Sequence, residues 1–422
     1  MNDKNLFWKI RSDHLTPQLS IIPQIQVTLN CNLACSYCFQ EHSGGIIDPL
    51  TVGEILRKTI SVNHQSGLNN ENTVIPVYWH GGEPLLAGLA FFRKVMEMES
   101  DFPGVIFENR IQTNGTLMTD ELAQFFAENH FQVGFSLDGP EDIHDLHRRF
   151  RNLGNGTFAD TMHGIELYRR YAKTDYIPVI AVVTRTSLDR VNDIYRFFKE
   201  LFAQVQLDIY DIRCSDLFPP PQDHSRLFEL APSPEEVGRF LIELFDLWFF
   251  DDTRKVDFSE LRNEVKMILQ PEINRGDPFH KRRCDFRRTI FDPEGRAFAC
   301  DQYINDHKTA LGDIRLDSME DILEKKERLW GEIKAHIRKS GKDMACASCE
   351  WVRICSGGCI TCMKYNALLL RARAKGLPDD RWFDVELVSP LKEVSGETYY
   401  CDGLRAFRDH VKEAVNRELS YE

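Results

Sequence analysis

Cys31-Asn-Leu-Ala-Cys35-Ser-Tyr-Cys38 places three cysteines within eight residues, directly after an apolar run over 25–29 that predicts a β-strand. Cysteine thiolates are the usual protein ligands of iron–sulfur clusters. Three thiolates can each hold one iron of a [4Fe–4S] cube and leave the fourth iron open to another molecule. The spacing by itself also suits a three-cysteine zinc site or a disulfide pair, so the remaining sequence has to separate these possibilities.

The composition is that of a soluble chain with two or three domains, at 422 residues and 42% hydrophobic content. The net charge of −13 disfavours nucleic acids and anionic membranes as partners. The sequence shows no signal peptide and no apolar run long enough to cross a bilayer. Twelve cysteines without a secretion signal indicate metal binding in a reducing compartment, so we predict a cytoplasmic metalloprotein.

Strand-like and helix-like segments alternate six times from Ile25 onward. Capping residues precede apolar positions spaced three and four apart, as with Thr119 before Leu122. Such βα units predict an α/β fold with a parallel sheet, and function at the carboxyl ends of its strands. Because six units are two short of a closed barrel, we predict an open, TIM-like partial (β/α)6 barrel. The predicted strands are 25–29, 74–79, 105–111, 132–137, 177–183 and 205–212.

The chain divides into five predicted parts. Three consecutive prolines, Pro219 to Pro221, end the alternating pattern, and a capping box over 233–236 opens a packing helix. Eight cysteines from Cys284 onward mark a region of different character. The parts are an N-terminal extension (1–24), the barrel (25–218), a linking helical segment (219–279), a cysteine-rich domain (280–405) and a C-terminal helix (406–422).

Polar or glycine-rich segments follow the second, third and fourth predicted strands. In His80-Gly81-Gly82-Glu83-Pro84 the glycines permit close approach to the backbone, and Glu83 can accept a hydrogen bond from an ammonium group. Gln112-Thr113-Asn114-Gly115 and Ser136-Leu137-Asp138-Gly139-Pro140 add polar groups. Each segment alone is typical of a turn. Together, at the carboxyl ends of parallel strands, they predict one ligand site beside the cysteines.

A second group of cysteines begins at Cys284. Asp292-Pro293-Glu294-Gly295 is a turn sequence that predicts a hairpin between Cys284 and Cys300. Of the six cysteines that follow, five continue the group: Cys346, Cys349, Cys355, Cys359 and Cys401. The first four of these five also suit a zinc ribbon when taken alone.

The motifs together resemble the radical S-adenosylmethionine (SAM) enzymes that carry a SPASM auxiliary-cluster domain. From Ile25 to about Lys412 the chain is similar to anaerobic sulfatase-maturating enzymes and to maturases of ribosomally made peptides. The resemblance is carried by 31–39, 112–117, 136–140, 300–303 and 346–359. It implies three [4Fe–4S] clusters, with SAM bound to the first.

The resemblance also implies a role for each site residue. The first cluster would be held by Cys31, Cys35 and Cys38, the proximal auxiliary cluster by Cys284, Cys300 and Cys359, and the distal one by Cys346, Cys349, Cys355 and Cys401. The fourth ligand of the proximal cluster is not decided by the resemblance. That iron would either lack a protein ligand or be bound by Cys362 or Cys214. SAM would contact Phe39, Gly81, Gly82, Glu83, Pro84, Gln112, Asn114, Ser136 and Asp138.

Asp301 directly follows Cys300. In the sulfatase-maturating enzymes the aspartate at this position is the general base, so the resemblance implies the same role here. A carboxylate between substrate and cluster is suited to take a proton as an electron leaves. The implied reaction removes a hydrogen from a side-chain Cβ by a 5′-deoxyadenosyl radical, with a flavodoxin- or ferredoxin-type electron donor.

Two departures from the sulfatase-maturating pattern bear on the product. His80 stands where those enzymes usually have glutamine, and Pro278 stands where they carry an eighth cysteine. Both features favour a peptide maturase that forms a cyclophane or thioether side-chain cross-link, with His80, Gln40 and Tyr303 as substrate contacts. The alternative is formylglycine formation from serine or cysteine in a sulfatase. An alternative of another class is a non-catalytic iron–sulfur or zinc protein acting in binding or electron transfer.

A basic run flanks Cys284 in this acidic protein, formed by Lys281-Arg282-Arg283 and Arg287-Arg288. Such runs are usually solvated faces. The alternative hypothesis is that this run contacts an acidic leader segment of a substrate peptide.

Overall fold

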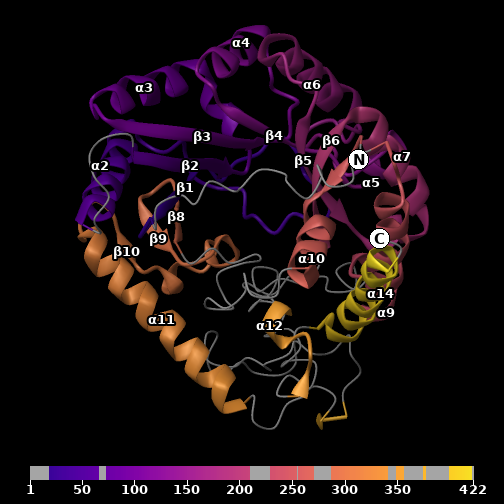
Figure 1. The fold of residues 1–422 in the computed structure, drawn as a ribbon. Helices are drawn as coiled ribbons and strands as arrows, with labels where there is room; N and C mark the ends of the chain where they lie inside the picture. The colour runs from indigo at the N-terminus through magenta and orange to yellow at the C-terminus, as the bar shows by residue number, and fades with distance from the viewer. Residues whose placement is uncertain are drawn as a thin grey trace.

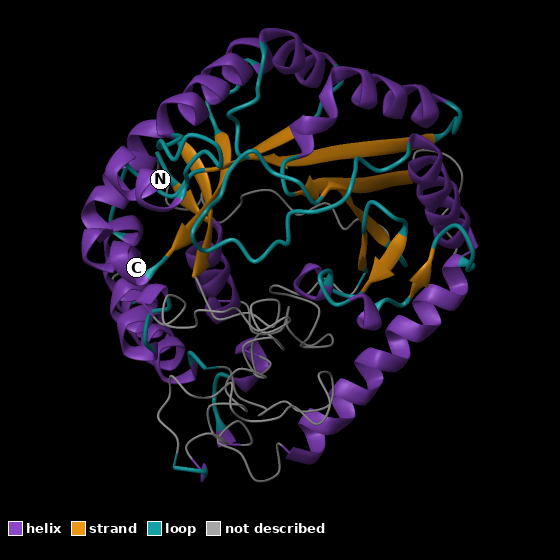
Figure 2. Cartoon of the chain, turned by 180° about the vertical axis from the view of Figure 1, so that it is seen from behind, coloured by secondary structure: helices purple, strands orange, loops and turns teal. Residues whose placement is uncertain are grey.

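The computed structural model describes residues 19–65, 73–209, 229–253, 255–269, 287–340, 348–355, 374–376 and 399–420. Its centre is one curved sheet with the strand order β10-β9-β8-β1-β2-β3-β4-β5-β6-β7. Figure 1 shows helices α2, α3, α4, α6 and α7 along the outside of this curve. The view from behind in Figure 2 shows the same arrangement, with the strands inside the ring of helices.

Six neighbouring strands run parallel and form the predicted partial barrel. They confirm the predicted alternation, and their starts lie within three residues of the predicted ones. The end predicted for the sixth strand, 210–212, lies outside the described residues. The strands are β1 (Ile22–Thr28), β2 (Thr73–Gly81), β3 (Val105–Thr113), β4 (Gln132–Ser136), β5 (Ile177–Val183) and β6 (Ala203–Ile209).

Four short strands extend the barrel sheet at both edges. β7 (Asp257–Phe258) pairs with β6, while β8 (Arg288–Phe291) pairs in parallel with β1. β9 (Arg296–Phe298) and β10 (Gly312–Asp313) continue the second edge in antiparallel fashion. The predicted hairpin turn is confirmed, with Gly295 at φ +84°. The sequence did not indicate that this hairpin joins the barrel sheet, because strand pairing over such a distance leaves no local pattern.

The helices confirm the predicted caps. Thr119 Oγ1 accepts the backbone N–H of Leu122 at 3.2 Å, and Ser233 and Glu236 form the predicted capping box. The C-terminal helix begins at Cys401, five residues before its predicted start. The barrel helices are α2 (Pro49–Gln65), α3 (Gly88–Ser100), α4 (Asp120–Glu128), α5 (Glu141–His147), α6 (Phe158–Ala172) and α7 (Val191–Leu201). The later helices are α9 (Pro234–Phe249), α10 (Ser259–Leu269), α11 (Met319–Ser340), α12 (Val352–Cys355) and α14 (Cys401–Leu419).

The two faces of the barrel sheet differ in polarity. On β2, Val77 and Trp79 are fully buried in the core, and Trp79 packs edge to face against Phe91 of α3. Tyr78 and His80 point to the opposite face because successive side chains of a strand alternate. The apolar face therefore carries the helices, and the polar face is left free to form a chamber.

Among the helices of the described residues, none is both long and apolar enough to cross a membrane.

Candidate cofactor and substrate site

A cavity of about 610 Å³ lies on the inner face of the barrel sheet. Strand alternation supplies its walls, as with Arg110 and Gln112 of β3 and Gln132, Gly134 and Ser136 of β4. The predicted residues that line it are Cys31, Cys35, Cys38, Phe39, His80, Gly81, Gly82, Gln112, Asn114, Ser136 and Asp301. The predicted residues Gln40, Glu83, Pro84, Asp138 and Tyr303 are not among the lining residues.

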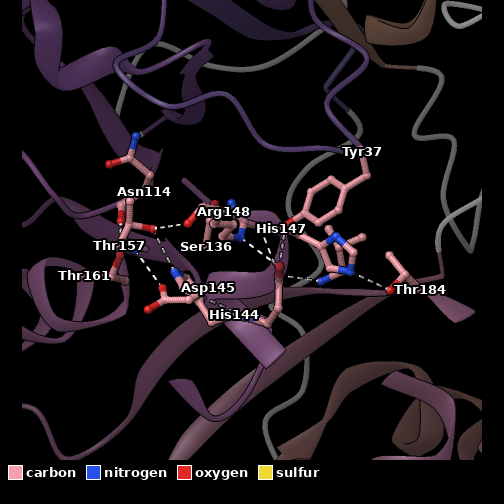
Figure 3. A network of polar contacts seen from close by, with 12 residues as sticks. Tyr37, Asn114, Ser136, His144, Asp145, His147, Arg148, Thr157, Thr161 and Thr184 are labelled. Atoms are coloured by element: carbon pink, nitrogen blue, oxygen red, sulfur yellow. Dashed lines mark hydrogen bonds and ion pairs between the residues drawn. The ribbon is translucent and has the colours of Figure 1, made fainter. Parts of the chain in front are cut away.

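The cysteine loop, which we define as residues 30–40, is fastened along its length. Ala34 donates its backbone N–H to Arg149 O at 2.9 Å, and Ser36 donates its own to His147 O at 3.0 Å. The Ser36 hydroxyl also lies 2.7 Å from Nδ1 of His147. Figure 3 shows His147 reaching on to Thr184, whose Oγ1 lies 3.2 Å from His147 Nε2. The end of α5 and the residues directly after it therefore fix the path of the cysteines.

The thiols of the cysteine loop fit an iron–sulfur cluster. Burial raises the pKa of Cys31 to about 11 and that of Cys35 to about 12, the second against the opposing charge of Arg148. Neither thiol ionises unaided near neutral pH, so a thiolate here needs a bound metal centre as its partner. Among the described residues no three His, Cys, Asp or Glu side chains converge on one point as a single ion requires. A cube takes each thiolate on a different iron and needs no such convergence.

The glycine pair after β2 lies against the start of the cysteine loop. A Cβ added to Gly81 would lie 2.2 Å from Thr28 O, and one added to Gly82 would lie 2.2 Å from Asn30 O. Gly82 also donates its N–H to Thr28 O at 2.7 Å. The two glycines therefore let β2 pack closely against β1 directly before Cys31. The close approach of a ligand to this backbone stays a prediction.

Gly82→Ala is expected to displace Asn30 and with it Cys31. Overpacking of this kind costs about 1–3 kcal/mol in the free energy of unfolding. We expect a lower thermal midpoint and less iron and sulfide bound per chain after anaerobic reconstitution. Gly45→Ala is the matched control, because a Cβ there meets nothing within 4 Å. Equal iron content and stability in both variants would contradict the packing role of Gly82.

Glu83 lies behind the cavity wall, fully buried. Its Oε1 accepts from the Leu85 N–H at 2.9 Å and from Thr113 Oγ1 at 2.7 Å, and its Oε2 accepts from the Asn114 N–H at 2.8 Å. The carboxylate thus ties the ends of β2 and β3 and caps η1 (Pro84–Ala87). The expected contact with a ligand ammonium group stays a prediction, as does any ligand contact of Pro84.

Glu83→Gln is expected to destabilise the fold by about 1–3 kcal/mol, since the new NH₂ group would face a buried donor.

Burial raises the pKa of Glu83 from 4.5 to about 7, against the three hydrogen bonds. The folded state therefore binds this proton more tightly than the unfolded chain. Stability from this group is full below pH 4.5 and falls as the pH rises to about 7. Urea unfolding between these pH values should show the slope in the native chain and not in Glu83→Gln, with the exposed Glu97→Gln as control.

Asp138 is also buried rather than in the cavity, at 2% exposure. Arg148 donates to both its oxygens, from Nε at 2.9 Å and from Nη2 at 3.0 Å, and Tyr37 donates its hydroxyl to the same carboxylate. Although burial opposes the shift, the Arg148 guanidinium holds the pKa of Asp138 below its usual value. Because Tyr37 lies between Cys35 and Cys38, the buried ion pair anchors the cysteine loop. The SAM contact expected for Asp138 stays a prediction.

Arg148 and His147 are site residues that sequence reasoning missed. His147 ends α5 and Arg148 follows it directly, more than a hundred positions from the cysteine loop that they hold. Neither belongs to a motif, and no local pattern marks them. Tyr37 could have been singled out, since it stands within the cysteine motif itself.

Asp301 faces the cavity from η6 (Asp301–Tyr303), and its Oδ1 lies 3.5 Å from Cys300 Sγ. His80 and Arg288 line the same cavity. Burial lowers the pKa of half-buried His80, Asp301 opposes this shift, and Arg288 adds to it. His80 is therefore neutral near pH 7 and can donate or accept a hydrogen bond.

Two predicted substrate contacts support this region instead of lining the cavity. Gln40 donates from Nε2 to Asn305 Oδ1 at 3.2 Å, and Asn305 donates from Nδ2 to Phe39 O at 2.7 Å. Tyr303 is largely buried within η6. Gln40 thus links the cysteine loop to the segment that carries Asp301. A substrate contact by either residue stays a prediction.

Four of the cysteines predicted to hold the auxiliary clusters lie in described segments: Cys300, Cys349, Cys355 and Cys401. The cysteines outside the described residues are Cys214, Cys284, Cys346, Cys359 and Cys362, as are Pro278 and the run 281–283. Trp351 donates to Asp409 Oδ1 at 2.8 Å and so joins the segment before α12 to α14. The auxiliary clusters and their ligand sets stay predictions.

Comparison with known proteins assigns the class. A family model for the radical SAM superfamily matches residues 25–198. The cysteine-type anaerobic sulfatase-maturating enzyme of Clostridium perfringens (strain 13 / Type A) is 30% identical over 354 residues, covering 82% of this chain and 90% of the relative. The serine-type enzyme of Bacteroides thetaiotaomicron is 29% identical over 351 residues, covering 78% and 80%. The chain is a radical SAM enzyme, and it belongs to the family that contains the anaerobic sulfatase-maturating enzymes.

Solved structures agree with this assignment. Native anSMEcpe with bound AdoMet and Cp18Cys peptide matches with a TM-score of 0.70 and 26% identity, over 95% of this chain and 99% of that one. Streptococcus suis SuiB bound to precursor peptide SuiA matches with a TM-score of 0.57 and 16% identity, over 81% and 72%, which shows a shared fold. The cross-link favoured by the sequence gains no support from the named relatives, which fit the sulfatase-maturating alternative better.

Proposed function

We propose that this enzyme oxidises a side-chain Cβ of a polypeptide by two electrons and produces formylglycine from a cysteine or serine of a sulfatase. The observation that carries the proposal is the position of Asp301, which lines one cavity together with the three cysteines and the glycine pair. Similarity to sulfatase-maturating enzymes of both the cysteine and the serine type, over about four-fifths of the chain, supports the substrate class.

The cysteine loop would hold the SAM-binding cluster through Cys31, Cys35 and Cys38, with SAM lying along Phe39, Gly82, Gln112, Asn114 and Ser136. When bound, SAM and the iron–sulfur clusters supply a radical that removes one hydrogen atom and an acceptor for one electron. The chain itself provides the orientation of the substrate and the exclusion of water. A flavodoxin- or ferredoxin-type protein is the proposed electron donor.

Asp301 would complete the oxidation as general base. Removal of one hydrogen atom from Cβ and one electron leaves one proton to be lost from the thiol or hydroxyl group of the substrate. The Asp301 carboxylate takes that proton. Serine then yields the aldehyde directly, while cysteine yields a thioaldehyde that water converts to the aldehyde with release of hydrogen sulfide.

A side-chain cross-link is the second candidate, and His80 favours it. This neutral imidazole lines the cavity beside Asp301 and could orient a neighbouring side chain for attack by the carbon radical. The same two-electron balance holds, since a new bond replaces two hydrogens.

One experiment separates the two products. The anaerobically reconstituted enzyme is incubated with SAM, a reductant and either a sulfatase-derived peptide or a candidate precursor peptide, and the products are analysed by mass spectrometry. We expect an aldehyde in the sulfatase peptide. A loss of two hydrogens in the precursor peptide alone, with a new bond between side chains, would replace formylglycine formation by cross-linking.

A further inference from the structure

Four side chains form a polar floor of the cavity, three or four residues before the carboxyl ends of their strands. Strand register places Gln24 of β1 beside Tyr78 of β2, and Tyr78 beside Arg110 of β3. Arg288 begins β8 on the other side of β1. All four line the cavity, and His80 lies two residues nearer to the carboxyl ends of the strands. We call Gln24, Tyr78, Arg110 and Arg288 the cavity floor.

The cavity floor holds buried hydrogen-bond donors without acceptors. Gln24 is 2% exposed, and its Nε2 has no partner among the described residues, while its Oε1 accepts from Arg288 at 3.4 Å. Arg110 donates to Tyr78 OH and to Glu108 Oε2, both at 2.8 Å, yet within the described segments its Nε is also without a partner. Buried polar groups are nearly always hydrogen-bonded in native proteins, so unpaired donors point to a missing acceptor.

The cavity floor also carries a positive charge that is not compensated locally. The Arg288 guanidinium lies 4.3 Å over the ring of Tyr78 and forms no ion pair within the described part of the chain. Arg110 is paired with Glu108. Asp301 is the one carboxylate among the described lining residues, and it does not pair with Arg288. An anionic acceptor at the cavity floor would therefore meet one net positive charge, that of Arg288. It would also meet hydrogen-bond donors of Arg288, Gln24 and Arg110.

We infer that the cavity floor binds a carboxylate of the polypeptide substrate, on an acidic side chain close to the modified residue. This inference rests on the proposed function, in which a polypeptide enters the cavity. The planar guanidinium of Arg288 matches the two oxygens of a carboxylate, and the amide of Gln24 and Nε of Arg110 supply further donors. Arg288 of the basic run thus lines the chamber itself, where it would contact a residue next to the modified one. The leader contact expected for the rest of the run stays a prediction.

The test measures binding to the reconstituted enzyme with SAM and without reductant. A set of fluorescent peptides carries one cysteine and a single glutamate, placed in turn at each neighbouring position, and a second set carries glutamine instead. At one position we expect the glutamate peptide to bind about tenfold or more tightly than its glutamine partner. Arg288→Gln should abolish that difference. Arg57→Gln, an exposed arginine on α2, is the matched control and should keep it.

Further variants protect the test against a folding defect. Gln24→Leu removes a neutral donor and should reduce the glutamate advantage, and Arg288→Glu should transfer the preference to peptides with lysine at the same position. Equal binding of glutamate and glutamine peptides at every position, or an advantage that survives both Arg288→Gln and Arg110→Gln, would overturn the inference. Product formation is scored separately. If formylglycine forms but no glutamate peptide is preferred, only the carboxylate subsite is contradicted. If a glutamate peptide is preferred but no oxidised product forms, the proposed function is contradicted.

Discussion

Asp301→Asn is expected to lower the rate of product formation by at least about 100-fold, the usual contribution of a positioned general base. The amide keeps the size of the side chain but cannot take the proton released with the second electron. Because Asp301 is not in the cysteine loop, SAM binding and the iron content of the first cluster should stay unchanged. Mass spectrometry of the peptide and assay of 5′-deoxyadenosine measure both halves of the reaction.

Asp306→Asn is the matched control for this variant. Asp306 caps η7 (His307–Thr309) by accepting the Lys308 N–H, and asparagine can keep that cap. Asp306 is not among the residues that line the cavity. Full product formation by Asp301→Asn would show that Asp301 is not the general base. The mechanism proposed from the similarity to sulfatase-maturating enzymes would then be contradicted.

Asp138→Asn is expected to cost about 3–5 kcal/mol in the free energy of unfolding, because it leaves the Arg148 guanidinium buried without a counter-charge. The variant should also bind less iron, since Tyr37 loses its charged acceptor between two of the cysteines. Urea unfolding and iron analysis after reconstitution measure the two effects. The double variant with Arg148→Met should recover part of the stability, as removal of both charges is less costly than removal of one.

Asp142→Asn provides the comparison on the surface. Asp142 pairs with Arg190 at 2.7 Å, and the two side chains are 60% and 40% exposed, so the loss should be small, below about 1 kcal/mol. A similarly small loss in Asp138→Asn would contradict the anchoring role of the buried pair.

The sequence predicted the fold well because its signals are local. Each barrel strand is a short segment with apolar side chains on the face that meets the helices, and the hairpin before Cys300 follows from its turn residues. The cysteine motif and the glycine pair could likewise be found from the sequence, because each consists of residues close together in the chain. The structure brings them together because parallel strands end at one edge of the sheet.

The parts of the site that sequence reasoning missed depend on contacts between distant segments. Tyr37 and Asp138 are separated by 101 positions, and Gln24 and Arg288 by 264. No periodicity or capping rule relates such pairs. For Glu83 a local motif was not enough. Its place in the motif predicted a ligand contact, whereas its three hydrogen bonds in the structure join the ends of two strands.

Transfer of deuterium is the most direct test that this enzyme oxidises a side-chain Cβ. A sulfatase-derived peptide whose target cysteine carries two deuterons at Cβ is incubated with the reconstituted enzyme, SAM and a reductant. We predict 5′-deoxyadenosine with one deuterium, formed in step with a formylglycine that retains the other. Unlabelled 5′-deoxyadenosine beside an unchanged peptide, from enzyme whose first cluster is intact, would contradict hydrogen abstraction at this carbon.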